Sequence, residues 1–140
     1  MCIIACMHNS WSPEIPFEHS EVTRITPNAG VYRILQDIDY PRYNGSTRII
    51  KIGMSRASLK NEIRNHFNRH VAANRLKRVK QNNGIKITVQ LLETEPDEAY
   101  RLELQLLRDF EIKHWDLPLL NSTRGFVRGT DGVLLTKTVS

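Results

Sequence analysis

The first regular hydrophobic pattern of the chain begins at Gly30. Residues 30–36 (GVYRILQ) and 48–52 (RIIKI) are rich in β-branched and aromatic side chains, and the polar stretch 37–47 separates them. This composition is typical of β-strands. Because the connection between them is short, we expect the two strands to pair antiparallel.

In the next segment an apolar residue recurs every four positions, at Leu59, Ile63, Phe67 and Val71. This stripe predicts an amphipathic helix over about 59–80. Residues 85–91 then alternate between apolar and polar side chains, which indicates a half-buried strand. A second helix is expected to start at Thr94, whose hydroxyl can cap it, with Pro96 in its first turn, and to run to about His114.

The order of these elements, strand-strand-helix-strand-helix, predicts an α+β fold with a small three-stranded sheet flanked by helices. Residues 8–29 combine three prolines with polar side chains, so we expect an irregular N-terminal arm over 1–29. Turn-forming residues after Asn121 favour a C-terminal hairpin. We therefore divide the chain into this arm, a domain over 30–121 and an extension over 122–140.

The composition of the 140 residues fits one ordered domain. Hydrophobic residues make up 40% and charged residues 25% of the chain, which excludes a mostly disordered protein. The longest apolar run, residues 1–7, is far shorter than the roughly 20 residues that span a bilayer, and it lacks the features of a signal peptide. We expect a cytoplasmic protein with no membrane partner. Four potential metal ligands lie near the N-terminus, but their spacing fits no zinc module. We therefore treat them as structural residues, namely Cys2, Cys6, His8 and His19.

The positive charge of the chain is concentrated in one segment. Lys and Arg total 20 against 15 Asp and Glu, and between Arg56 and Lys86 the only acidic residue is Glu62. A basic run of this kind is either a solvated helix face or a patch that follows a phosphate backbone. In the second case the residues that would contact DNA are Arg64, Arg69, Arg75, Lys77, Arg78 and Lys80.

Glu103 breaks the apolar pattern of the second helix. At about 100° per residue it projects into the middle of an apolar arc formed by Ala99, Leu102, Leu106, Leu107 and Phe110. An unpaired carboxylate in such an arc is costly. Glu103 therefore forms a core ion pair with an arginine, reaches the rim of the arc, or has a metal-binding or catalytic role.

Three further residues are candidates for chemistry, and each also has an ordinary structural explanation. Tyr32 in the first strand and Lys51 in the second could share one face of the sheet. Strand tyrosines are usually part of the core, however, and strand lysines usually lie at an edge. His66 follows Glu62 by one helical turn, and a histidine beside an apolar stripe is usually structural.

Taken together, these positions resemble the GIY-YIG nuclease domain. The residues that carry the resemblance stand in the family's order from Gly30 to Asn121, about two thirds of the chain. They are Gly30-Val31-Tyr32, Lys51-Ile52-Gly53, Asn65-His66-Phe67, Glu98-Ala99-Tyr100-Arg101-Leu102-Glu103 and Pro118-Leu119-Leu120-Asn121. Valine replaces the isoleucine of the first triplet, and lysine replaces the tyrosine of the second.

The resemblance implies a metal-dependent DNA endonuclease that hydrolyses phosphodiester bonds. Glu103 would hold Mg²⁺ or Mn²⁺, which polarises the phosphate, and Tyr32 would help to deprotonate the attacking water. Lys51 would promote ionisation of Tyr32 or neutralise phosphate charge, and His66 would assist proton transfer. Asn121 would hold the geometry of the site through hydrogen bonds.

One position departs from the family. The family places a catalytic arginine one helical turn before His66, where this chain has Glu62, and a glutamate there would repel the phosphate. Arg64 points about 200° away from Glu62 on a helix, so Arg56 and Arg69 are the better substitutes. Without a substitute, the chain would be a GIY-YIG-like nucleic-acid-binding module that cuts slowly or not at all. A protein-interaction domain with coincidental motifs is a third hypothesis, and the sequence is compatible with a monomer or a homodimer.

Overall fold

Four antiparallel strands form the sheet at the centre of the fold. In the computed structural model of the chain, which describes residues 10–68 and 84–121, they lie in the order β1-β4-β2-β3. The bounds are Ile15–Pro16 for β1, Gly30–Pro41 for β2, Ser46–Ser55 for β3 and Ile87–Glu93 for β4. In this sheet β1 and β3 are therefore the edge strands.

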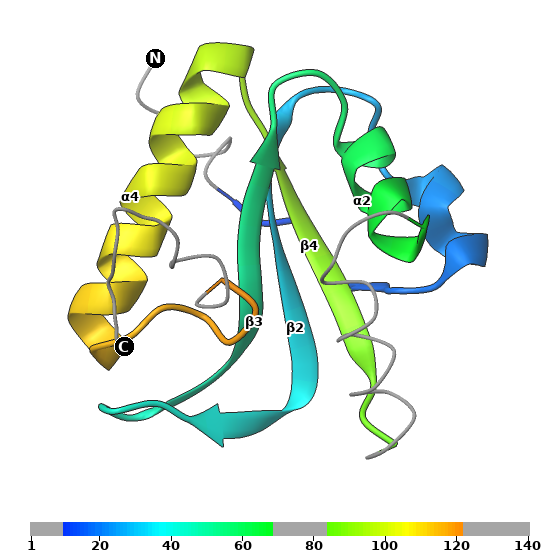
Figure 1. Cartoon of the computed structure of the whole chain (residues 1–140). Helices are drawn as coiled ribbons and strands as arrows, with labels where there is room; N and C mark the ends of the chain where they lie inside the picture. The colour runs from blue at the N-terminus through cyan, green and yellow to red at the C-terminus, as the bar shows by residue number, and fades with distance from the viewer. Residues whose placement is uncertain (1–9, 69–83, 122–140) are drawn as a thin grey trace.

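Helices cover both faces of the sheet (Figure 1). Helix α4 (Pro96–His114) packs along one face against β3 and β2, while α2 (Leu59–Asn68) and the 3₁₀ helix η1 (His19–Arg24) pack together on the other. The edge strand β3 contacts both α2 and α4. Between the sheet and α2 lies an apolar core that includes Ile34, Ile50 and Ile63, none of them more than 1% exposed.

The fold is α+β as expected, but the expected three-stranded sheet is wrong because the N-terminal arm supplies a fourth strand. Strand β1 pairs with β4, with Ile15 opposite Val89 and Pro16 opposite Thr88. Ile15 and Phe17 are buried and Pro16 is exposed, so the alternation of a half-buried strand is present. The prolines concealed it, because proline usually argues against a strand, although an edge strand tolerates it. The arm is therefore partly regular, with η1 as its second element.

The hairpin of β2 and β3 pairs antiparallel as expected, but it is longer than the expected strands over 30–36 and 48–52. Its register places Tyr32 opposite Gly53 and Ile34 opposite Lys51, with an irregularity at Leu35. The added part of β2 begins with residues 37–39, whose side chains are exposed. Where a strand extends beyond the core, its side chains are exposed and show no alternation of apolar and polar residues. The sequence therefore predicted strands that were too short.

Helix α4 ends at His114 as expected, but its N-cap residue is Glu95 and not Thr94. The hydroxyl of Thr94 donates to the backbone oxygen of Glu95, and no side chain caps the helix. Of the helix expected over 59–80, the described residues include α2 up to Asn68. The rest of that helix and the expected C-terminal hairpin lie outside the described residues. In the part of the chain that the structure covers, no helix has the length and apolar character needed to cross a membrane.

Glu14 fastens the start of β1 to two other strands. Its carboxylate accepts hydrogen bonds from the guanidinium of Arg48 at 2.8 and 3.1 Å and from the hydroxyl of Thr88 at 2.7 Å. These bonds hold the pKa of Glu14 below its ordinary value of 4.5. A carboxyl group with a lowered pKa stabilises the fold above its ordinary pKa, and the stabilisation is lost as pH falls through the folded-state pKa.

We therefore expect Glu14→Gln to lower the free energy of unfolding at about pH 7, by no more than about 1 kcal/mol because the pair is exposed. As the pH is lowered below 4.5, the variant and the wild type should become more alike, because the wild-type carboxylate takes up a proton once the pH passes its lowered pKa. Urea unfolding at neutral pH and at successively lower pH values measures this difference. Glu18→Gln, at an exposed glutamate nearby, is the control, and an undiminished Glu14→Gln effect at low pH would contradict the expectation.

Candidate functional site

The hydroxyl of Tyr32 lies between a histidine and a glutamate of α2. Its oxygen is 2.7 Å from Nε2 of His66 and 3.0 Å from Oε2 of Glu62. The phenol donates its single proton to Glu62, because a carboxylate only accepts. His66 then donates its Nε2 proton to the phenol oxygen. The three side chains, which we call the Tyr32–His66–Glu62 set, thus form a hydrogen-bonded chain that ends on Glu62.

The members of this set differ in their access to solvent. Tyr32 and His66 are each 1% exposed, whereas the side chain of Glu62 is 24% exposed. Oε2 of Glu62 also lies 3.7 Å from Nε2 of His66, which makes an ion pair when the imidazole is protonated. Glu62 is therefore the member through which the set meets the solvent.

Both motif glycines permit close packing of the backbone, and Gly53 does so against this set. Gly53 lies opposite Tyr32, and a Cβ atom at Gly53 would collide with the hydroxyl and Cζ of Tyr32 and come to 2.8 Å from its Cε1. A Cβ atom at Gly30 would collide with the backbone oxygen of Leu92 in β4. The Tyr32 ring therefore lies directly against the backbone of β3.

Lys51 lies on the same face of the sheet as Tyr32. It is two residues before Gly53, it stands opposite Ile34, and it is half-buried. Paired residues of neighbouring strands share a face, and residues two apart along a strand do so as well. The structure therefore places Lys51 on the face that α2 covers, as the sequence suggested.

Glu103 lies on helix α4, on the other face of the sheet. It is half-buried within the inward arc expected from the sequence, near Ala99 and Phe110, which are buried. In residues 10–68 and 84–121, no three His, Cys, Asp or Glu side chains converge on one metal position. Mg²⁺ is commonly bound by one or two carboxylates and keeps several waters, so a single glutamate is compatible with that ion. The expected site residues are divided between the two faces, with β3 between them.

Asn121 binds the outer edge of β3. Its side chain accepts a hydrogen bond from the N–H of Ile52 at 2.8 Å and donates one to the carbonyl of Ile52 at 2.9 Å. The N–H of Leu120 donates to the carbonyl of Ile50 at 2.8 Å. These are hydrogen bonds of the kind expected for Asn121, and they hold the strand segment next to Gly53.

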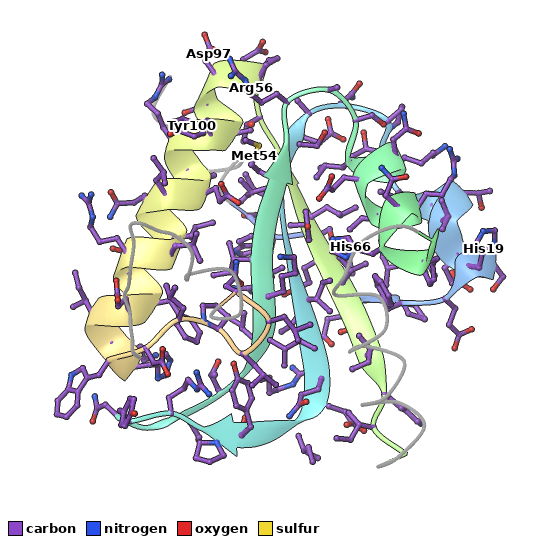
Figure 2. The ribbon with its side chains drawn as sticks, viewed as in Figure 1. His19, Met54, Arg56, His66, Asp97 and Tyr100 are labelled. Carbon is purple, nitrogen blue, oxygen red and sulfur yellow. The ribbon has the colours of Figure 1, made fainter. Side chains whose placement is uncertain are left out.

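Arg56 is paired with Asp97 at the start of α4. Its Nη2 atom is 2.7 Å from Oδ1 of Asp97, and the two side chains are 58% and 76% exposed. Figure 2 shows this pair near Tyr100, at the N-terminal end of α4 and well apart from His66. The structure therefore does not bring Arg56 to the Tyr32–His66–Glu62 set.

Of the residues expected to contact DNA, Arg64 is in the described part of the chain. Its side chain is exposed on α2 and donates to Oδ1 of Asn61 at 3.0 Å. The other expected contacts lie outside the described residues, namely Arg69, Arg75, Lys77, Arg78 and Lys80. Cys2, Cys6 and His8 lie outside them too, whereas His19 is exposed and packs edge-on against Phe67, with ring centroids 5.5 Å apart.

Sequence reasoning missed one contact and one member of the site. It placed Glu62 one turn before His66, where the structure has the two side chains together, but it did not find the hydrogen bond between Glu62 and the Tyr32 hydroxyl. Phe17 packs edge-on against His66, with centroids 6.5 Å apart, and stacks on Phe67 at 4.6 Å. The alternation around Phe17 was the signal for it, hidden by the prolines of the arm.

Comparisons of the chain with family models, curated proteins and solved structures found no match. The chemistry of the side chains described above is therefore the basis for assigning a function.

Proposed function

We propose that the chain is an endonuclease that hydrolyses phosphodiester bonds in DNA with the help of a divalent metal ion, which is the activity implied by its resemblance to the GIY-YIG domain. The observation that carries the proposal is the Tyr32 hydroxyl held between His66 Nε2 and Glu62 Oε2. A carboxylate tied into such a chain can receive a proton from a water molecule. The order β2-β3-α2-β4-α4, with Gly53 against Tyr32, supports the same proposal.

Glu62 is the base in this mechanism, because it is the member of the set that solvent reaches. As the oxygen of an attacking water forms a bond to phosphorus, its proton passes to the Glu62 carboxylate. The bond from phosphorus to the leaving oxygen breaks, and that oxygen takes up a proton from solvent. Tyr32 and His66 act as positioning residues, since their hydrogen bonds fix the carboxylate on α2.

Positive charge for the phosphate would come from elements on both sides of β3. Lys51 shares the face of Tyr32 and would neutralise part of the phosphate charge. A magnesium ion held by Glu103 would polarise the phosphate. Arg56 is paired with Asp97 at the N-terminal end of α4, away from the Tyr32–His66–Glu62 set, and has no assigned role at this phosphate.

The second candidate function is a nucleic-acid-binding module without cleavage. The observation that favours it is the Glu62 carboxylate itself, which occupies the position of the family's arginine and would repel a phosphate brought to Tyr32. On this alternative, the basic segment that begins on α2 binds DNA, and Glu62 prevents the chemistry. Arg56 fits this alternative as well, since its partner is Asp97 rather than the Tyr32–His66–Glu62 set.

Nicking of supercoiled plasmid by the wild type in Mg²⁺, Mn²⁺ or EDTA tests the proposal, with Glu103→Gln in parallel. We expect nicking that EDTA abolishes. In Glu103→Gln, the Mg²⁺ concentration needed for half-maximal rate should rise by about tenfold or more, because a carboxylate ligand is replaced by a neutral amide. The control is Glu111→Gln, at an exposed position of the same helix, which should leave the Mg²⁺ dependence unchanged.

A salt-sensitive gel shift without any nicking would contradict the proposal and support the binding module. Neither nicking nor a gel shift at low salt would contradict both candidate functions. Nicking with an unchanged Mg²⁺ dependence in Glu103→Gln would keep the nuclease and reject Glu103 as the metal ligand.

A further inference from the structure

A cavity of about 220 Å³ lies between α4 and the sheet, on the face opposite to Tyr32. Figure 1 shows α4 over this face. Successive residues of a strand point to opposite faces, so Arg33 faces the cavity while Tyr32 faces α2. Four parts of the chain supply its wall, which includes Trp11, Arg33, Ile49, Ile52, Phe110 and Lys113.

Arg33 is the half-buried cation of this wall. Its Nε atom donates to Oε1 of Gln90 at 2.9 Å, and the guanidinium carbon lies 4.3 Å from the centre of the Trp11 ring. Both partners are neutral, and burial lowers the pKa of Arg33. Among the residues that the structure describes, no carboxylate lies within ion-pair distance of Arg33. Glu14, whose charge acts on Arg33 from further away, is already bound by Arg48.

Within residues 10–68 and 84–121 the terminal nitrogens of Arg33 make no hydrogen bond, so no group in that part of the chain uses their N–H donors. Burying part of a cation costs free energy because the charge loses contact with water, and no carboxylate compensates for this at Arg33. A bound anion would offset the cost. Lys113, at an exposed position of α4, adds a second positive charge to the wall. Asp109 also contributes to the wall, and its carboxylate accepts a hydrogen bond from Gln105 at 2.8 Å.

The rest of the cavity wall is apolar and in part aromatic. The indole of Trp11 and the ring of Phe110 contribute flat surfaces, and Ile49, Ile52 and Leu106 contribute aliphatic ones. Such a mixture of apolar walls and a few placed polar groups is typical of small-molecule sites. The volume is below the usual range of about 300–1,000 Å³ for drug-sized ligands, so it suits a ligand with a single ring.

We propose that this cavity binds a small organic anion with a flat apolar body, whose carboxylate or phosphate group is held by Arg33 and Lys113 while its ring lies against Trp11 and Phe110. The site is distinct from the Tyr32–His66–Glu62 set, because the sheet separates the two. The cavity wall includes neither this set nor Glu103, so the proposal does not depend on the proposed nuclease function.

Titration of the ¹⁵N-labelled full chain with benzoate and with phenyl phosphate tests this proposal by NMR. Benzamide supplies the ring without the charge, and inorganic phosphate supplies the charge without the ring. We expect saturable shifts of the Trp11 indole N–H with at least one aromatic anion, and affinity at least about tenfold weaker for benzamide and for inorganic phosphate. The indole of Trp115 is 66% exposed outside this cavity and serves as the internal control.

Two charge-removing variants locate the anionic group. Arg33→Gln should weaken binding of the aromatic anion by about tenfold or more, and Lys113→Gln should weaken it by a smaller factor. Because Lys113 is exposed, its variant remains informative even if Arg33→Gln fails to fold. Arg64→Gln removes the same charge from α2, on the other face of the sheet, and should have no effect.

Three outcomes would overturn the proposal. The first is the absence of saturable shifts with both aromatic anions up to about 10 mM, a concentration that detects even weak sites. The second is equal binding of benzamide, which would mean that the cavity recognises only the ring. The third is an equal loss of affinity in Arg64→Gln, which would mean that only the net charge of the protein attracts the anion.

Discussion

Replacing Glu62 by glutamine is expected to slow metal-dependent DNA cleavage by about 10²–10⁴-fold, the usual contribution of a general base. Glutamine has nearly the same shape and keeps an acceptor for the Tyr32 hydroxyl, so the hydrogen-bonded chain from His66 persists. What is lost is the negative charge that receives the proton of the attacking water. Single-turnover nicking rates at saturating Mg²⁺ measure this effect, and urea unfolding confirms that the fold is retained.

Glu21→Gln is the matched control for this substitution. Its side chain is 28% exposed, close to the 24% of Glu62, and its carboxylate is bound by Arg24 at 2.7 Å in η1, which packs against α2. Glu21→Gln should cleave at the wild-type rate. If Glu62→Gln also cleaves at the wild-type rate, Glu62 is not the base.

Replacing Gly53 by alanine is expected to cause a large loss of stability. The new methyl group would overlap the Tyr32 ring, which cannot withdraw because its hydroxyl is fixed by His66 and Glu62. Overpacking of this kind costs about 1–3 kcal/mol, and here the rigid ring places the cost toward the upper end. Thermal or urea unfolding measures the loss.

Two further variants distinguish this steric clash from the loss of stability that follows when any glycine with an unusual backbone conformation is replaced. Gly45 has φ +75° in the exposed β2–β3 turn, so Gly45→Ala should cost about 1 kcal/mol through backbone conformation alone. Adding Tyr32→Val to Gly53→Ala removes the ring that the methyl group meets, and the double variant should be more stable than the sum of the two single effects predicts. Strict additivity would contradict the close packing of Tyr32 on Gly53.

Sequence patterns identified the elements in which buried apolar residues and exposed polar residues alternate regularly. Helix α4 and strand β4 have strong periodic patterns, and their observed ranges lie close to the expected ones. Strand β1 was missed because Pro16 stands between the two buried residues that mark it, Ile15 and Phe17. The outer part of the β2–β3 hairpin was missed because backbone pairing continues there after the side chains have left the core.

The candidate site was only partly accessible to sequence reasoning. Spacing alone suggested that Tyr32 and Lys51 share a face, because strand alternation is a local property. Contacts between distant segments are not local, and for this reason Asp97, which is 41 residues after Arg56, was not foreseen as its partner. The same holds for Glu62. Its negative charge was evident from the sequence, but its hydrogen bond with the hydroxyl of Tyr32, a residue 30 positions earlier, was not.

The nicking rate of Glu62→Arg decides whether Glu62 is the base, because this substitution restores the residue type that the resemblance expects one turn before His66. A guanidinium cannot take a proton from water. We therefore expect Glu62→Arg to nick supercoiled plasmid no faster than Glu62→Gln, far below the wild type. A rate above the wild type would contradict this expectation, because Glu62 would then be a repulsive substitution in a weakened nuclease and not the base of a working one.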